Sequence, residues 1–246
     1  MMSRDISDRL IRVWTTAVDT GPIEPRIDVY RPLLSADEAH RIDRFVQPED
    51  ALRFVIGRAL ARTMLSEYAE IAPRDWPLVI DDHRRPQLGP LPHGTPDLRF
   101  NLSHTEGLVA CAVAIGREVG VDVEHVGRRL LHDVPERFFS AREVADLRSL
   151  PGDEQALAFF DYWTLKEAYI KARGLGLALP LRQFTFLRAA GHAPTVSFAP
   201  ELQDDPTTWQ FAQFQPTFDH RMSVAVRRVG EDLSIRVERV VPRVPA

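Results

Sequence analysis

The sequence predicts an α+β protein built from two similar halves. Each half contains a serine-led helix capping box, at Ser35–Glu38 and at Ser140–Glu143. Each box is followed by a short helical pattern, then a long one, then strand patterns. We therefore expect an internal duplication, with subdomains at residues 1–118 and 119–246. Two capping boxes could also coincide by chance, and the pattern alone does not exclude that alternative.

In the first half, apolar residues recur at helical spacing through the long helix, and a stretch rich in proline, glycine and charge follows it. The predicted elements are strands at 10–14 and 27–30, a short helix to about residue 45, a long helix from 48 to about 71, a loop at 73–96, and strands at 98–102 and 107–115.

In the second half, a short strand precedes the capping box, and Gly174 and Gly176 are the stop signals of the long helix. The predicted elements are a strand at 120–124, a short helix after Ser140, a long helix at 154–173, and strands near 184–188, 194–198, 208–214, 222–229 and 233–239.

The composition is that of an ordinary soluble protein. The 246 residues are 44% hydrophobic and 27% charged, and a formal net charge of −4 gives no global reason to expect nucleic acid. No apolar run approaches membrane-spanning length, and residues 1–11 do not resemble a signal peptide. The single cysteine, Cys111, excludes an internal disulfide and lies in an apolar run. We expect a cytoplasmic protein.

Two acidic residues alternate with valines in Gly120-Val-Asp-Val-Glu124. Alternate side chains of a strand share a face, so Asp122 and Glu124 point the same way. Two neighbouring carboxylates repel each other, and a hard divalent cation is the usual compensation. The alternative is a solvated acidic strand edge. Taken by itself, this short pattern favours that alternative.

Glu167 and Lys171 lie four residues apart on the predicted long helix, which places them on one face. A surface ion pair is the simple interpretation. However, most of the surrounding helix is apolar, and a charged pair on a largely buried helix is costly unless it lines a cleft. Lys166, next to Glu167, could reach the same ligand.

Ser103 and His104 follow Phe100-Asn-Leu at a strand end. A serine nucleophile with its base is one interpretation, but adjacent residues rarely have that geometry. We prefer phosphate binding by the hydroxyl, the imidazole and backbone N–H groups. Several arginines could clamp phosphates or simply cover a solvated helix face and a loop; these are Arg53, Arg58, Arg62, Arg84 and Arg85.

Together these motifs resemble the 4′-phosphopantetheinyl transferase superfamily, in particular the surfactin-synthetase-activating type. Four family patterns are present with the family spacing and order. They are G-[IV]-D-[IV]-E at Gly120–Glu124, W-x-x-K-E-A/S-x-x-K at Trp163–Lys171, F-N-[IL]-S-H-[ST] at Phe100–Thr105 and R-F-F-S-x-x-E at Arg137–Glu143. The resemblance runs from about residue 35 to 190. It implies two similar α+β subdomains in a pseudo-two-fold arrangement, with coenzyme A bound between them.

The resemblance also implies residue roles. The implied Mg²⁺ ligands are Asp122, Glu124 and Glu167; the implied coenzyme A contacts are Arg53, Arg85, Ser103, His104, Asp122, Lys166 and Lys171, with Arg41 as a weaker match. Lys171 would offset charge on the leaving phosphate. Our own first candidate for the general base is Glu167, acting directly or through a metal-bound water, and Glu143 is the second. In this chain Arg84 stands where the family often has glycine, which affects the expected contact near the adenine.

The resemblance predicts transfer of 4′-phosphopantetheine from coenzyme A to a serine of an apo acyl or peptidyl carrier protein. Because one chain contains both halves, we expect a monomer. Arg128, Arg129, Leu130 and Leu131 are candidates for the surface that binds the carrier. A different Mg²⁺-dependent phosphotransferase would share the carboxylates, but the sequence has no G-x-x-x-x-G-K-[ST] loop. The remaining alternative is a non-catalytic coenzyme A-binding module.

Overall fold

The computed structural model of the chain describes residues 7–18, 21–81, 85–127, 133–176, 179–189 and 191–244. It confirms the α+β class. Contacts divide the chain into two compact units, which we call unit 1 (Met1–Arg117 with Ser234–Ala246) and unit 2 (Glu118–Leu233).

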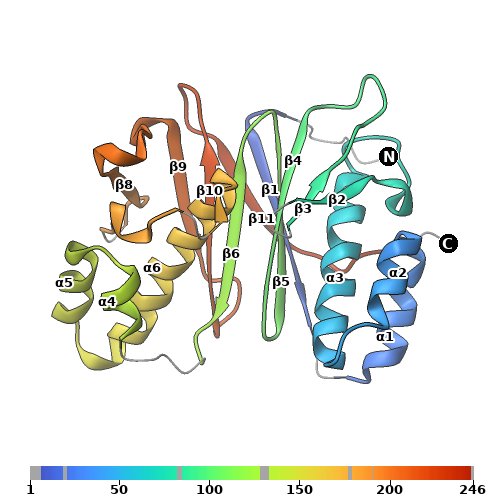
Figure 1. Cartoon of the computed structure of the whole chain (residues 1–246), viewed down its shortest axis with the longest axis horizontal. Coiled ribbons are helices and arrows are strands. Elements are labelled where there is room, and N and C mark those ends of the chain that lie inside the picture. Colours follow the sequence, from blue (N-terminus) through green and yellow to red (C-terminus); the bar gives the residue numbers. More distant parts are fainter. Residues whose placement is uncertain are drawn as a thin grey trace. The chain divides into compact units, whose positions relative to one another are not determined.

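Unit 1 is a four-stranded sheet with helices packed against it (Figure 1). Its elements are β1 (Leu10–Ala17), α1 (Ile23–Tyr30), α2 (Ala36–Ile42), α3 (Pro48–Leu65), β2 (Leu78–Ile80), β3 (Pro86–Leu88), β4 (Leu98–Thr105), β5 (Leu108–Ile115), β11 (Ser234–Arg239), and short 3₁₀ turns at Arg31–Leu33 and Pro73–Asp75. The strand order is β11-β1-β5-β4, and β2 and β3 form a separate hairpin.

Unit 2 is a three-stranded sheet with one long helix across it (Figure 1). Its elements are β6 (Val119–His125), α4 (Val134–Phe138), α5 (Ala141–Ser149), α6 (Gly152–Arg173), β7 (Phe184–Leu187), β8 (Thr195–Phe198), β9 (Trp209–Phe214), β10 (His220–Arg227), and 3₁₀ turns at Leu181–Gln183, Pro200–Leu202 and Pro206–Thr208. The order is β6-β10-β9, and β7 pairs only with β8.

The two units repeat one plan of chain order and strand pairing. In each, a strand leads into a capped short helix, then a long helix, then a two-stranded hairpin, then two strands. The first strand pairs antiparallel with the last, which pairs antiparallel with the one before it: β1-β5-β4 in unit 1 and β6-β10-β9 in unit 2. This agreement in topology is far more specific than two capping boxes and supports the expected duplication.

Each capping box also holds a buried cation. In unit 1 the box residue Glu38 accepts from Arg62 Nε on α3 at 2.7 Å, and Arg62 Nη1 donates to three backbone carbonyls near the start of the β2–β3 hairpin. Arg58 contacts the same carboxylate at 3.3 Å. Both arginines are buried. They therefore hold α3 to α2 and to the hairpin, and the structure excludes the phosphate clamp considered for Arg58 and Arg62.

The strand β11 belongs to a different unit from the one expected. The sequence places residues 119–246 in one subdomain, whereas Ser234–Arg239 pairs in parallel with β1 of unit 1. The Trp14 indole of β1 also donates to Glu238 of β11 at 3.2 Å. Backbone pairing with β1 is therefore what places this last strand in unit 1.

Two segments were predicted wrongly. Residues 27–30 belong to helix α1, although Ile-Asp-Val-Tyr alternates like a strand; the helix starts behind Pro22 and buries Ile27 in the core around α3. The expected loop at 73–96 contains the β2–β3 hairpin. The long helix α3 also ends at Leu65, earlier than expected, where Ser66 bonds back to the carbonyls of Arg62 and Ile71.

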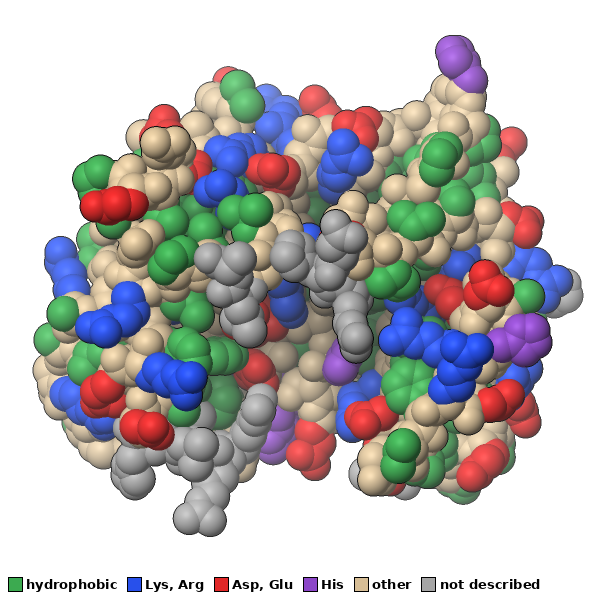
Figure 2. Space-filling model, in the orientation of Figure 1, with side chains coloured by type: hydrophobic (Ala, Val, Ile, Leu, Met, Phe, Trp, Pro, Cys, Tyr) green, Lys and Arg blue, Asp and Glu red, His purple; other side chains and the backbone are tan. Residues whose placement is uncertain are grey.

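Charged side chains of both signs are interspersed over the face shown in Figure 2. This mixture agrees with the modest net charge of the sequence. In the part of the chain that the structure describes, no helix is long and apolar enough to cross a bilayer.

Candidate active site

The acidic strand β6 presents its two carboxylates toward helix α6. Asp122 pairs across the sheet with Ser223, and Glu124 with Arg221. The Ser223 hydroxyl lies 2.8 Å from that of Thr164 on α6, which fixes the direction of this face. Partners in an antiparallel pair share a face, so Asp122 and Glu124 also face α6. The shared face predicted from the alternation is therefore present.

Gly120 at the start of this motif allows α6 to pack directly on β6. A Cβ at this position would lie 2.1 Å from the carbonyl oxygen of Ala168 and 2.6 Å from the backbone nitrogen of Ala172. Both atoms belong to helix backbone and cannot move aside. A side chain at Gly120 would push α6 away from the strand that carries Asp122.

Lys171 links α6 to the acidic strand. Its Nζ donates to Asp122 Oδ1 at 2.6 Å and to the carbonyl oxygen of Val121 at 3.2 Å. The Asp122 side chain is almost fully buried, whereas that of Lys171 is 22% exposed. A buried carboxylate needs such a partner. Asp122 is thus held by an ammonium group that solvent can still reach.

Glu167 lies one helical turn before Lys171 on α6. The pKa of its carboxyl is raised to about 7, and burial is the largest cause. The negative charges of Asp122 and Glu124 also raise this pKa, whereas the positive charge of Lys171 lowers it. The four groups are therefore close enough to act on one another electrostatically. A carboxyl that titrates near neutral pH is suited to proton transfer.

The donor set suits a hard divalent cation in its chemistry. The charges of Asp122 and Glu124 raise the pKa of Glu167, and a cation that joins the three carboxylates would relieve this repulsion; Mg²⁺ prefers carboxylate oxygens with water and phosphate. Among the described residues, however, no three His, Cys, Asp or Glu side chains gather closely enough to hold a metal ion. The ammonium of Lys171 is the cation bound at Asp122.

Glu143 and Lys166 have a different role from the one predicted. Neither side chain has exposed surface, and Lys166 Nζ lies 2.8 Å from Glu143 Oε2. Lys166 also donates to the carbonyls of Leu181 and Phe184, and Glu143 accepts from the backbone of Phe186. The pair is the unit 2 counterpart of Glu38 and Arg62. Their burial does not suit Glu143 as a general base or Lys166 as a coenzyme contact.

Ser103 and His104 lie within β4, ahead of the tight turn at Glu106 and Gly107. Adjacent strand residues point to opposite faces, so the two side chains diverge. Ser103 is buried on the same face as Asn101, whereas His104 is exposed. A paired nucleophile and base is therefore excluded, and a joint contact of both side chains with one phosphate group is not favoured.

The predicted coenzyme-binding arginines of unit 1 are held by neighbouring carboxylates. Arg53 on α3 donates to Asp50 at 2.5 Å. Arg85 donates to Asp81 through its backbone and its guanidinium, at 2.8 and 2.7 Å, just before β3. These contacts orient both guanidinium groups before any ligand binds. Arg41 lies over the ring of Phe54, 5.1 Å from its centre.

Some predicted positions cannot be compared with the structure. Arg84 and the candidate carrier-binding residues Arg128, Arg129, Leu130 and Leu131 lie outside the described residues. The remaining predicted residues divide between the units. Arg53, Arg85, Ser103 and His104 belong to unit 1, and Asp122, Glu124, Glu167 and Lys171 to unit 2.

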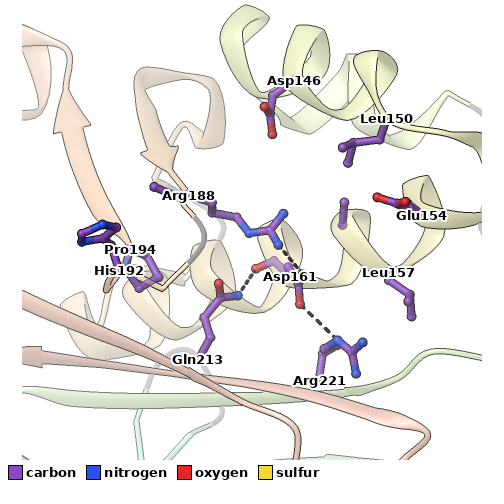
Figure 3. A pocket seen from close by; sticks show the side chains of 12 residues that line it. Asp146, Leu150, Glu154, Leu157, Asp161, Arg188, His192, Pro194, Gln213 and Arg221 are labelled. Carbon is purple, nitrogen blue, oxygen red and sulfur yellow. Dashed lines mark hydrogen bonds and ion pairs between the residues drawn. The ribbon is translucent and has the colours of Figure 1, made fainter.

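Sequence reasoning missed a second polar group on the same face of unit 2. Asp161 on α6 binds Arg188, which follows β7, and Arg221 on β10 (Figure 3). Arg221 stands opposite Glu124 in the sheet register. Arg221 and Glu124 are far apart along the chain, so only the strand register brings them together. No local sequence pattern marks Arg188 or Arg221 as part of a site.

Comparison with known proteins gives a consistent result. A family model described as the 4′-phosphopantetheinyl transferase superfamily matches residues 118–227, and one described as the N-terminal part of 4′-phosphopantetheinyl transferase matches residues 21–115. The chain is 34% identical to 4′-phosphopantetheinyl transferase HetI of a Nostoc species over 221 residues, 89% of each chain. It is 31% identical to 4′-phosphopantetheinyl transferase Sfp of Bacillus subtilis, over 63% of this chain and 67% of that protein.

Proposed function

The chain belongs to the 4′-phosphopantetheinyl transferase superfamily, and from this premise we propose how unit 2 performs the transfer. The enzyme moves 4′-phosphopantetheine from coenzyme A to a serine of an apo carrier protein. The serine Oγ forms a bond to the pantetheine-side phosphorus, the bond from that phosphorus to the bridging oxygen breaks, and adenosine 3′,5′-bisphosphate leaves.

Glu167 is our candidate for accepting the serine proton. The observation that supports this assignment is the position of Glu167 on α6, one helical turn before Lys171 and close enough to Asp122 and Glu124 for their charges to raise the pKa of its carboxyl. A cation bound by these carboxylates would lower that pKa, so the assignment rests on position. The buried Glu143 is no longer a candidate, because its oxygens are bound to Lys166 and to backbone N–H groups.

Asp122, Glu124 and Glu167 are the residues that we propose to hold Mg²⁺. When bound, the ion supplies charge neutralisation at the phosphate oxygens. Lys171 is poised for a similar task. Its ammonium is fixed by Asp122 and partly open to solvent, so it can approach the leaving phosphate and offset the charge that grows there.

In unit 1 we propose that Arg53, Arg85 and His104 contact the phosphates and nucleotide of coenzyme A. The pre-oriented guanidinium groups of Arg53 and Arg85 support this, because little conformational entropy is lost when such a side chain binds an anion. Ser103 is proposed as a coenzyme contact on the other face of β4. A monomeric state and a cytoplasmic location stay predictions.

The test uses the full chain with Mg²⁺, coenzyme A and several apo carriers of the fatty acid, polyketide and peptide-synthetase types. Mass spectrometry should show one phosphopantetheine added to at least one carrier, and the best carrier identifies the pathway. Absence of addition to every carrier would favour a coenzyme A-binding module.

A variant separates chemistry from binding. Glu167→Gln should lower the transfer rate at least a hundredfold, the low end for loss of a general base, while coenzyme A affinity measured without metal changes little. Glu201→Gln removes an exposed carboxylate elsewhere in unit 2 and should leave both unchanged. Near-normal transfer by Glu167→Gln would contradict the assigned role.

A further inference from the structure

Unit 2 contains a pocket of about 440 Å³ that none of the proposed transfer chemistry uses (Figure 3). Its walls come from α5, α6, β9, β10 and the segment around β7 and β8. The volume is within the usual range for small-molecule sites. We propose that this pocket is a second ligand site, which binds a small carboxylic acid with a short aliphatic chain.

The floor of the pocket is a guanidinium pair fixed by one carboxylate. Asp161 Oδ2 accepts from Arg188 Nη2 at 2.5 Å, and Asp161 Oδ1 lies 3.3 Å from Arg221 Nε. Gln213 donates to the backbone oxygen of Asp161 at 3.0 Å. All of these residues lie on or directly beside regular elements. The two cationic groups are therefore held in place before a ligand arrives, which lowers the entropic cost of binding.

The guanidinium groups keep donors for a ligand. A guanidinium carries five N–H donors. Within the described part of the chain, Arg188 donates one hydrogen bond, to Asp161, and lies over the ring of Tyr162, 5.1 Å from its centre. Its side chain is 25% exposed and that of Arg221 is 17% exposed. Both can thus reach a ligand while remaining partly shielded from water.

The charges disfavour a doubly charged anion. Arg188, Arg221 and Asp161 together carry one net positive charge, but Asp146 and Glu154 also line the pocket and bring these five side chains to a net charge of −1. The exposed carboxylates of Asp146 and Glu154 stand at the rim, and Asp146 accepts from the Tyr162 hydroxyl. A phosphate ester with two charges would be repelled there, whereas one carboxylate matches the floor.

An apolar wall gives room for a short chain. The wall is formed by Leu150, Leu157, Ala158 and Pro194. Leu157 is 38% exposed, so part of its apolar surface is open for a ligand to cover. Each methylene that the ligand buries should raise affinity about fourfold. The wall and the floor together fit a carboxylate with a chain of several methylenes better than acetate, which has none, or inorganic phosphate.

The experiment titrates the full chain with sodium hexanoate, acetate and inorganic phosphate, and follows backbone amides by two-dimensional NMR in the presence of saturating coenzyme A. We expect saturable shifts around Arg188, Gln213 and Arg221, with hexanoate binding more tightly than acetate or phosphate. Displacement of hexanoate by coenzyme A, tighter binding of phosphate, or no shifts at these residues would each overturn the proposal.

Variants separate the floor from the wall. Arg188→Gln should weaken hexanoate and acetate alike by roughly tenfold, the loss expected for one charge-assisted hydrogen bond. Leu157→Ala should weaken hexanoate but not acetate. Arg228→Gln removes an arginine of unit 2 that is paired with Asp232 outside the pocket, and it should change neither affinity. Equal hexanoate affinity in the wild type and Arg188→Gln would overturn the assignment, even if the transfer activity were normal.

Discussion

Glu143 and Lys166 form an ion pair in which neither side chain is exposed, with 2.8 Å between Oε2 and Nζ. Each partner is completed by the backbone: Lys166 donates to two carbonyls of the segment that leads into β7, and Glu143 accepts from Ser140 and Phe186. Full satisfaction of this kind is what makes buried charge tolerable. The pair ties α5, α6 and the β7 region into one unit.

Loss of one partner should lower stability rather than alter chemistry directly. Lys166→Met leaves the Glu143 carboxylate buried and unpaired, and should lower the free energy of unfolding by about 3–5 kcal/mol. Urea denaturation measures this. Lys171→Met, on the same helix but partly exposed, should lower stability less and transfer more. A Lys166→Met enzyme with wild-type stability but no transfer would contradict the structural role.

The same lysine should make stability depend on alkaline pH. Burial is the main cause that lowers the pKa of Lys166 to about 8 in the folded chain, from an ordinary value of 10.5. Between these values the unfolded chain binds more protons, so this residue's contribution to stability rises with pH. This contribution is followed as the difference in unfolding free energy between wild type and Lys166→Met, measured from pH 8 upward.

From pH 8 to 10.5 that difference should increase by an amount on the order of 3 kcal/mol, because each pKa unit corresponds to about 1.4 kcal/mol. Urea denaturation of both proteins across this range measures it, and titrating groups that do not interact with Lys166 cancel because both proteins contain them. A difference that falls over the same range would show that the neutral lysine is not favoured in the folded state.

Two glycines should respond in opposite ways to alanine. Gly120→Ala places Cβ against the backbone of α6 and should cost about 3 kcal/mol or more, with loss of transfer as α6 moves away from β6. Gly57 lies within α3, and a Cβ added there would have Val109 Cγ1 as its nearest neighbour, at 3.8 Å. Gly57→Ala should therefore raise stability by up to about 1 kcal/mol. Thermal unfolding distinguishes the two, and equal effects would contradict the close packing at Gly120.

Arg62 should be as important to unit 1 as Lys166 is to unit 2. Arg62→Met removes the closer of the two arginine partners of Glu38 and the donor to the carbonyls of Pro73, Arg74 and Trp76, and should cost about 3–5 kcal/mol. The exposed pair of Arg31 with Asp28 provides the control, because Arg31→Met should change stability by less than about 1 kcal/mol. Similar losses in both variants would argue against the buried role of Arg62.

The sequence was most informative where charged residues follow the periodicity of a strand or a helix. Alternation in β6 predicted that Asp122 and Glu124 share a face, and the spacing in α6 predicted that Glu167 and Lys171 do. Those features depend on local geometry, which a short segment determines. The repeated capping boxes likewise indicated a duplication that the strand pairing of the two units supports.

Burial and long-range partners could not be predicted in this way. Lys166 is adjacent to Glu167 and is also a charged residue, and only its position on the helix relative to α5 and β7 makes it a core residue. Arg221 reaches its place opposite Glu124 through the register of β10 on β6. The helix at residues 27–30 was missed because its packing on α3 overrides an alternating pattern.

The pairing of β11 with β1 has a consequence for how the chain folds during synthesis. Trp14 and Glu238, joined across these strands, are 224 residues apart along the chain. Unit 2 leaves the ribosome completely before the last strand of unit 1 does, so it can fold while β1 still has an open edge. Completion of unit 1 therefore waits until β11 has emerged, and nascent chains are most open to mispairing while that edge of β1 is exposed.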